Sequence, residues 1–291
     1  MDLDLAFDDS DFQRKEELKV GQSTSYNVKM CTELWFERDP DEEDTEYRIQ
    51  QLKFSGDYNY FQGNFEAATF KYQELLDLLP ANNFPVRQDV EESLSRCYMK
   101  LNRHKESIQT AQKLVDMMKV YDEAKQRQSL ILFSQVCKCA KDWPGCITAL
   151  EQLAHHQSHY AQFWLDLANA YYQYSHSEGE SISYNFQVRI VTCYIRARLL
   201  LESVLNTVGQ MTKERNQKLI AEIDQELSHL NVSSELIDQA AEITRADIEC
   251  QDALSTNGDE EDIEEKQKEK EKFCEEAFFK RWFSWAGKGL P

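Results

Sequence analysis

A repeating stripe of apolar residues marks the second half of the chain as helical. Between residues 186 and 204, apolar positions are spaced alternately by four and three residues, which is the period of one helix face. Two shorter stripes follow, and each comes after a residue that can cap a helix: Thr212 for the first, Ser233 or Ser234 for the second. Three helices are therefore predicted, around Phe186, Ile190, Cys193, Ala197, Leu200 and Val204, then Ile220, Ile223, Leu227 and Leu230, then Leu236, Ala240 and Ile243.

The segment GDYNYFQGNFEAATFKYQELLDLLP, residues 56–80, predicts two helices joined at Gly63. The same punctuation recurs 39 residues later in LSRCYMKLNRHKESIQTAQKL, and 39 residues later again in FSQVCKCAKDWPGCITALEQL. An internal repeat of this length predicts stacked helical hairpins. The matched positions are Gly56, Gly63 and Ala68, then Ser95, Asn102 and Ser107, then Ser134, Lys141 and Cys146.

The matched positions have a physical meaning. Small residues in the first and third positions allow two helices to approach closely. The middle position falls at the turn, where Asn102 can replace Gly63 because Asn tolerates the left-handed conformation that ends a helix. Lys141 tolerates that conformation less well, so KDWPG is expected to form a somewhat different turn.

The stretch FWLDLANAYYQY, residues 163–174, extends the pattern to a fourth unit. Trp164, Leu167, Ala168 and Tyr171 resemble the first-helix signature of a tetratricopeptide repeat, W-x-x-L-G-x-x-Y, with Ala in place of Gly. The resemblance covers residues 47–205. It implies an all-α, right-handed α-solenoid of about four helical hairpins over residues 46–210, closed by capping helices over residues 211–257.

The two ends of the chain differ from the repeats in composition. Residues 1–45 read as an acidic, largely disordered arm with a docked segment at Trp35 and Phe36. Residues 258–272 read as an acidic linker, and residues 273–291 as an aromatic C-terminal helix. In that helix Phe278, Trp282 and Trp285 share one face, which is expected either to pack back on the last repeat or to bind a partner.

Composition and charge narrow the classes of function. The chain has only nine Gly and five Pro in 291 residues, which favours an all-α protein. A net charge of −19 repels phosphate backbones, so nucleic acid is not expected as a partner. No apolar run approaches the ~20 residues that span a bilayer, so no membrane is expected. The eight cysteines follow no regular spacing and include no C-x-x-C pair, and the acidic N-terminal residues do not resemble a secretory signal. We therefore expect reduced cysteines and a protein of the cytoplasm or nucleus.

Four segments carry a more specific resemblance: NVKMCTELWFERD, NFPVRQDVEESLSRCYMKLNRH, FWLDLANAYY and YIRARLLL, in this order. They resemble the uncharacterised vertebrate family named for human chromosome 8 open reading frame 76, over residues 26–201. The family implies no activity that could be carried over to this chain.

A groove is expected where the first helices of the hairpins line the concave side of a tetratricopeptide solenoid. Four basic residues in this predicted groove suggest that it is locally positive and binds an acidic or C-terminal-carboxylate peptide. The other interpretation is that these residues only solvate a helix face. The groove residues are Lys53, Asp57 and Tyr60, then Glu92, Arg96 and Lys100, then Gln135 and Lys138, then Asn169 and Tyr172, with Trp35 and Trp282 as further partner-binding residues.

The predicted function is a non-catalytic scaffold or adaptor, with no cofactor. A chaperone C-terminal tail is not expected in the groove, because Asp57 follows Lys53 by one turn and would repel a carboxylate. Two alternatives stay open. One is a metal-binding or enzymatic helical protein that uses Cys137, Cys139 and Cys146 with His155 and His159. The other is self-regulation, in which the acidic N-terminal arm occupies the groove.

Overall fold

The computed structural model describes residues 34–37, 44–80, 82–119, 123–177, 182–256 and 273–287. These residues form eleven α-helices and two 3-10 helices, and none of them lies in a strand. The α-helices are α1 (Thr45–Phe61), α2 (Phe65–Leu78), α3 (Phe84–Lys100), α4 (His104–Met118), α5 (Glu123–Ala140), α6 (Trp143–His156), α7 (Ala161–Ser177), α8 (Tyr184–Ser203), α9 (Gln210–His229), α10 (Ser234–Thr256) and α12 (Glu275–Trp282). The 3-10 helices are η2 (Trp35–Glu37) and η3 (Ser284–Ala286).

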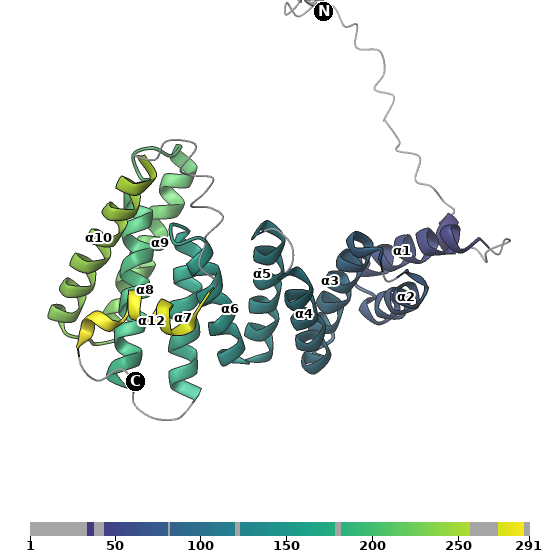
Figure 1. The fold of residues 1–291 in the computed structure, drawn as a ribbon, viewed down its shortest axis with the longest axis horizontal. Helices are drawn as coiled ribbons and strands as arrows, with labels where there is room; N and C mark the ends of the chain where they lie inside the picture. Colours follow the sequence, from purple (N-terminus) through teal and green to yellow (C-terminus); the bar gives the residue numbers. More distant parts are fainter. Residues whose placement is uncertain are drawn as a thin grey trace, which may run out of the picture.

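Consecutive helices stack along the length of the molecule. Each helix from α1 to α8 packs against the next one, and α8 also contacts α9 and α10. Figure 1 shows this progression from α1 and α2 at one end to the group of α8, α9 and α10 at the other. The all-helical prediction is confirmed, and the packing order is consistent with a helical solenoid.

Two apolar cores run through this stack. A small one joins α1, α2 and α3, with Leu52, Tyr72 and Leu75 at its centre. A larger one continues from α4 to α10 and includes the C-terminal segment. Trp164 is fully buried in the larger core, so the aromatic stretch on α7 is covered by its neighbours.

Three interhelical turns have the same geometry at the 39-residue spacing. Gly63, Asn102 and Lys141 have φ values of 80°, 57° and 59°. In each turn, the amide of the next residue donates to the carbonyl five positions earlier: Asn64 to Asn59, Arg103 to Tyr98 and Asp142 to Cys137. This is the helix-ending motif with a left-handed residue.

The expectation of a different turn at Lys141 was therefore wrong. The sequence after Lys141 supplies the reason, because Asp142 caps α6 and accepts a hydrogen bond from the Gly145 amide (3.3 Å). Pro144 in the first turn of α6 also suits a helix start. These residues fix where α6 begins, and Lys141 takes the backbone conformation that remains.

Small residues hold the hairpins close, as the repeat predicts. A Cβ atom built on Gly56 would lie 2.6 Å from the Tyr72 ring, so a larger residue does not fit there. In the next hairpin, Ser107 Oγ donates to the Ser95 carbonyl at 2.9 Å. Cys146 Sγ makes the corresponding contact with the Ser134 carbonyl at 3.6 Å.

The predicted caps of the last two stripes fared differently. Ser233 Oγ accepts from the Leu236 amide at 3.3 Å, which confirms a cap at the start of α10. Thr212 is not a cap, because α9 already begins at Gln210 with Gly209 at its N-cap.

Candidate functional site

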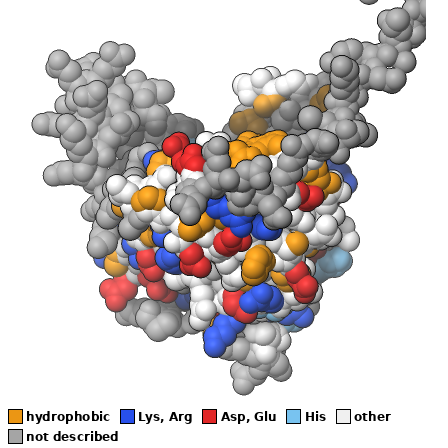
Figure 2. All heavy atoms as spheres, turned by 90° about the vertical axis from the view of Figure 1, so that its right-hand side faces the viewer, with side chains coloured by type: hydrophobic (Ala, Val, Ile, Leu, Met, Phe, Trp, Pro, Cys, Tyr) orange, Lys and Arg blue, Asp and Glu red, His pale blue; other side chains and the backbone are white. Residues whose placement is uncertain are grey.

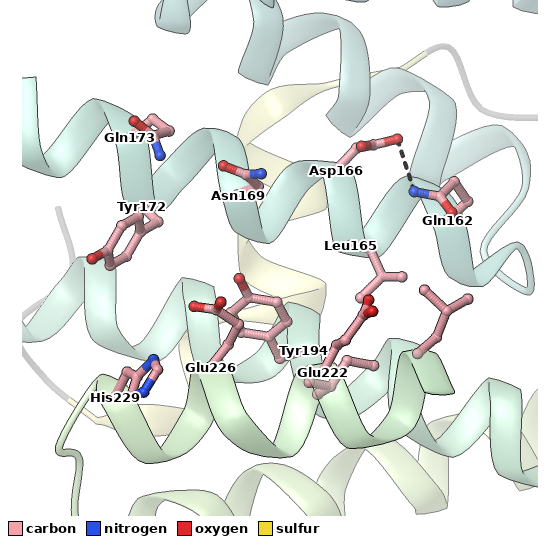
Figure 3. Close-up of a pocket in the computed structure, with 12 residues that line it drawn as sticks. Gln162, Leu165, Asp166, Asn169, Tyr172, Gln173, Tyr194, Glu222, Glu226 and His229 are labelled. Atoms are coloured by element: carbon pink, nitrogen blue, oxygen red, sulfur yellow. Dashed lines mark hydrogen bonds between the residues drawn. The ribbon is translucent and has the colours of Figure 1, made fainter. Parts of the chain in front are cut away.

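A hollow with a volume of about 640 Å³ lies between α7 and α9. Figure 3 shows Asp166, Asn169 and Tyr172 of α7 on one side and Glu226 and His229 of α9 on the other. Spacings of three and four residues place these side chains along one face of each helix. On α7, the opposite face carries the buried residues Trp164, Leu167, Ala168 and Tyr171.

A second hollow of about 230 Å³ lies beside the first, between α5, α6 and α7. The two hollows share Asp166 and Asn169, so they form one lined surface across α5, α7 and α9. Four of the predicted groove residues come together on this surface. They are Gln135, Lys138, Asn169 and Tyr172.

A third hollow, of about 430 Å³, lies between α3 and α5. Its lining includes Asp89, Glu92 and Lys125. Of the predicted groove residues on α3, Arg96 reaches this region through an ion pair with Glu92, and Lys100 is exposed at the end of the helix. These three hollows involve the odd-numbered helices from α3 to α9, while a separate hollow of about 630 Å³ is lined by α4 alone.

The surface is not basic, in contrast to the prediction. Lys53 Nζ lies 2.7 Å from Asp57 and 2.8 Å from Asp89, and Arg96 lies 2.8 Å from Glu92. Lys138 lies 3.6 Å from Asp166. Three of the four predicted cations are thus neutralised by carboxylates, two on the same helix as the cation (Asp57 and Glu92) and two on another helix (Asp89 and Asp166). Acidic partners at neighbouring positions cancel the field of these basic residues.

Three carboxylates line the α7–α9 hollow. The Asp166 carboxylate on α7 points toward Gln162, Glu222 and Glu226 come from α9 on the other side, and His229 is the one basic side chain in this lining. Tyr194 of α8 lies at the base of the hollow, and burial together with the Glu226 charge raises its pKa to about 12. Its phenol therefore stays protonated at neutral pH.

Sequence reasoning missed Asp166, Tyr194, Glu222 and Glu226. The 39-residue period could not place α9, because that helix lies beyond the repeats and has no matched turn. Asp166 had a signal, since it lies three residues before Asn169 on a helix whose register was already known.

Trp35 and Tyr60, predicted as contact residues, lie at the α1 end. Trp35 is 36% exposed, and its ring centroid lies 5.3 Å from that of Phe54 on α1. The Tyr60 ring contacts Phe61 and Phe65 in its own hairpin. Figure 2, which looks onto this end, shows apolar side chains scattered among acidic and basic ones.

Trp282 is not a contact surface, because it is buried with 5% of its area exposed. Its ring centroid lies 5.1 Å from that of Trp164, and the Arg196 guanidinium lies 4.1 Å above it. The alternative that the C-terminal aromatics pack back on the helical stack is therefore the correct one. The helix ends at Trp282, and Trp285 lies in η3 instead of on the same helix.

The alternative metal cluster is absent from the described part of the chain. No group of three His, Cys, Asp or Glu side chains there could hold a metal ion. Cys137 and Cys146 are buried in the core, and burial raises the pKa of Cys146 to about 12, so its thiol is protonated at neutral pH. Cys139 is exposed, and the His155 ring packs on Phe273, away from these thiols.

Two other expectations meet the described residues only in part. Residues 1–33 and 38–43 of the acidic arm and the linker at 258–272 lie outside the described residues, so the expected occupation of the groove by the arm falls there too. Among the helices that the structure describes, none is long and apolar enough to cross a membrane.

The chain is similar to two curated proteins, both uncharacterised. It is 28% identical to human "Uncharacterized protein C8orf76" over 167 residues, which are 57% of this chain and 43% of the human protein. It is 32% identical to the rat homolog over 105 residues, which are 36% of this chain and 28% of the rat protein. The matches thus span less than half of each relative.

These relatives confirm the resemblance carried by the four sequence segments. Residues 3–181, more than half of the chain, match the family described as "Family of unknown function (DUF5588)". The chain therefore belongs to the DUF5588 family.

Proposed function

We propose that this protein is a non-catalytic interaction scaffold or adaptor in an intracellular complex, in the cytoplasm or nucleus. Its contact face is formed by the odd-numbered helices α3, α5, α7 and α9. The observation that carries the proposal is the pair of adjoining hollows across α5, α7 and α9, joined at Asp166 and Asn169. A surface that crosses three helices suits an extended or helical partner segment.

The finer form of the fold belongs to the same proposal. The helices α1 to α8 are four tetratricopeptide-like hairpins in a right-handed solenoid, with α9 and α10 as the capping helices. Support comes from the three matching turns at Gly63, Asn102 and Lys141, since identical turns at a fixed spacing are what a repeat produces.

The charge of the face directs the choice of partner. An acidic peptide would meet Asp166, Glu222 and Glu226, and three of the four cations that could hold it are already paired. A chaperone tail is disfavoured for the same reason, since Lys53 is engaged by Asp57 and Asp89. The proposed partner segment is instead neutral or basic where it crosses α7 and α9.

Site-specific crosslinking tests the contact face. A photoreactive phenylalanine analogue replaces Gln135 or Gln173, which are exposed at the hollows, or Thr148, which is exposed on α6 outside them. Adducts formed in cells are identified, and the partner is then purified and tested against the full chain. A scaffold with this face gives adducts at the first two positions and not at Thr148.

Substitution of the same surface supplies the second half of the test. Asn169→Trp fills the point that both hollows share, whereas Thr148→Trp adds the same bulk outside them. The purified partner should bind the first variant at least about tenfold more weakly and the second with unchanged affinity. Equal binding by both variants would remove the contact face from consideration.

A further inference from the structure

Tyr194 is a buried side chain whose hydroxyl group has no partner in the described structure. Only 8% of the residue is exposed, and no hydrogen bond joins its hydroxyl to another described residue. Figure 3 shows the phenol between α7 and α9, with its oxygen toward the hollow. The ring is buried while the hydroxyl opens to the hollow without a partner among the described residues, so the hydroxyl is available to a ligand.

Three carboxylates line the same hollow from two helices. The Glu226 carboxylate accepts no hydrogen bond from a described residue and forms no ion pair with one, although it lines the hollow beside Tyr194. Glu222 lies 3.8 Å from Lys218 in a pair that is exposed on both sides. Asp166 accepts from Gln162 at 3.3 Å and lies 3.6 Å from Lys138. The negative charge at Glu226 is therefore the least compensated.

The walls of the hollow complement the stem of a long cationic side chain. Leu165 and Ile223 supply aliphatic surface on opposite sides, and Tyr172 supplies an aromatic ring. Lys and Arg side chains bury their methylene stems on such surface and place the charge on polar groups. Arg also pairs with carboxylates through several parallel hydrogen bonds and stacks on aromatic rings.

We propose that the α7–α9 hollow binds an arginine side chain of the partner segment, through the Glu226 carboxylate and the Tyr194 hydroxyl. Asp166 and Glu222 add attraction from the two walls, and the Tyr194 hydroxyl can accept from the guanidinium or donate to Glu226. The inference rests on the proposed function, because it assigns the chemistry of a partner to the contact face already described.

A peptide pair isolates the positive charge. A fluorescein-labelled peptide of Gly and Ser with two arginines is titrated with the full chain, next to the same peptide with citrulline at both positions. Citrulline keeps the shape of arginine and removes its charge. Fluorescence anisotropy should show binding of the arginine peptide that is at least about tenfold tighter.

Matched variants separate the hollow from the general negative charge of the molecule. Glu226→Gln and Glu249→Gln remove the same charge, but Glu249 is exposed on α10 outside the hollow. Glu226→Gln should weaken binding of the arginine peptide about five- to tenfold, and Tyr194→Phe about threefold. Glu249→Gln should change it by less than about twofold.

The outcomes distinguish this inference from the proposed function. Equal binding of the citrulline peptide, or equal loss in Glu226→Gln and Glu249→Gln, overturns the arginine site. The crosslinking at Gln135 and Gln173 does not depend on charge, so the scaffold proposal can stand when the arginine site falls. Melting temperatures of all variants are measured, and a loss of binding counts only where the fold is intact.

Discussion

Glu151 is a carboxyl group on α6 that is almost completely removed from water, with 4% of the residue exposed. Tyr171 donates a hydrogen bond to its Oε1 atom, while Oε2 has no partner. The pKa of Glu151 is raised from 4.5 to about 7, mainly by burial and further by the charge of Glu275 on α12. The hydrogen bond from Tyr171 and the charge of Arg189 lower this pKa but do not offset the burial. The folded protein therefore holds this proton at pH values where the unfolded chain has lost it.

This pKa shift predicts a stability that falls with rising pH. Between pH 4.5 and pH 7 the folded state binds more protons at Glu151 than the unfolded state does, so its contribution decreases across that window. Glu151→Gln keeps an acceptor for Tyr171 and cannot ionise. The free energy of unfolding of the variant, measured relative to that of the unsubstituted chain, should be higher at pH 8 than at pH 5 by on the order of 2 kcal/mol.

Urea unfolding at the two pH values measures the difference. Glu249→Gln, an exposed change of the same kind, should show almost none of it. If Glu151→Gln were equally stabilising at both pH values, the ionisation of Glu151 would not be the cause.

The turns between helices show how far a sequence pattern can carry a fold. Gly56, Ser95 and Ser134 were correctly identified as close-approach positions, because the size of a side chain is visible in the sequence. The turn at Lys141 was mispredicted, because propensity describes one residue while the start of α6 is fixed by Asp142 and Pro144. Tertiary context and the next helix cap outweigh a local cost of about 1–2 kcal/mol.

Glycine at position 141 should relieve that local cost. Lys141→Gly is expected to stabilise the protein by about 0.5–1 kcal/mol, because glycine adopts positive φ readily but loses more freedom on folding. Asn102→Gly should give a smaller gain, since asparagine already tolerates this conformation. Thermal and urea unfolding of the two variants provide the comparison, and a loss of stability in Lys141→Gly would mean that the lysine side chain has a role of its own.

The whole molecule combines a stack of repeated helices with α9, α10 and a C-terminal segment, whose positions the 39-residue repeat does not predict. The period located Gln135, Lys138, Asn169 and Tyr172 on one surface, but it was silent about α9 and about charges supplied by neighbouring helices. The destination of the C-terminal aromatics was left as two alternatives, since a segment far along the chain has no register with the repeats. Its place is set by Arg196, which is fully buried, pairs with Asp247 and lies between two tryptophan rings.

Removal of the C-terminal segment should therefore weaken the stack itself. A chain that ends at residue 256 loses Phe278, Trp282 and Phe283 from the large core, so its melting temperature should fall by about 5–10 °C. A synthetic peptide of residues 273–287 added in excess should restore part of the loss by binding the folded state.

A peptide with Trp282→Ala is the matched control for the restoration. It should restore much less, because it lacks the ring that packs against both Trp164 and Arg196. An unchanged melting temperature in the shortened chain would show that the segment rests on the stack without stabilising it.

The contact between Trp164 and Trp282 also means that this region cannot finish folding until Trp282 has been synthesised. Trp282 follows Trp164 by 118 positions, and ribosomes add about 5–20 residues per second. Trp282 is therefore synthesised about 6–24 seconds after the Trp164 ring on which it packs. During that interval the helices of the stack can form from local contacts, while the face around Trp164 and Arg196 stays open to water. The nascent chain thus presents an incomplete apolar surface until almost all of this sequence has been made, and chaperones or a neighbouring nascent chain can reach it.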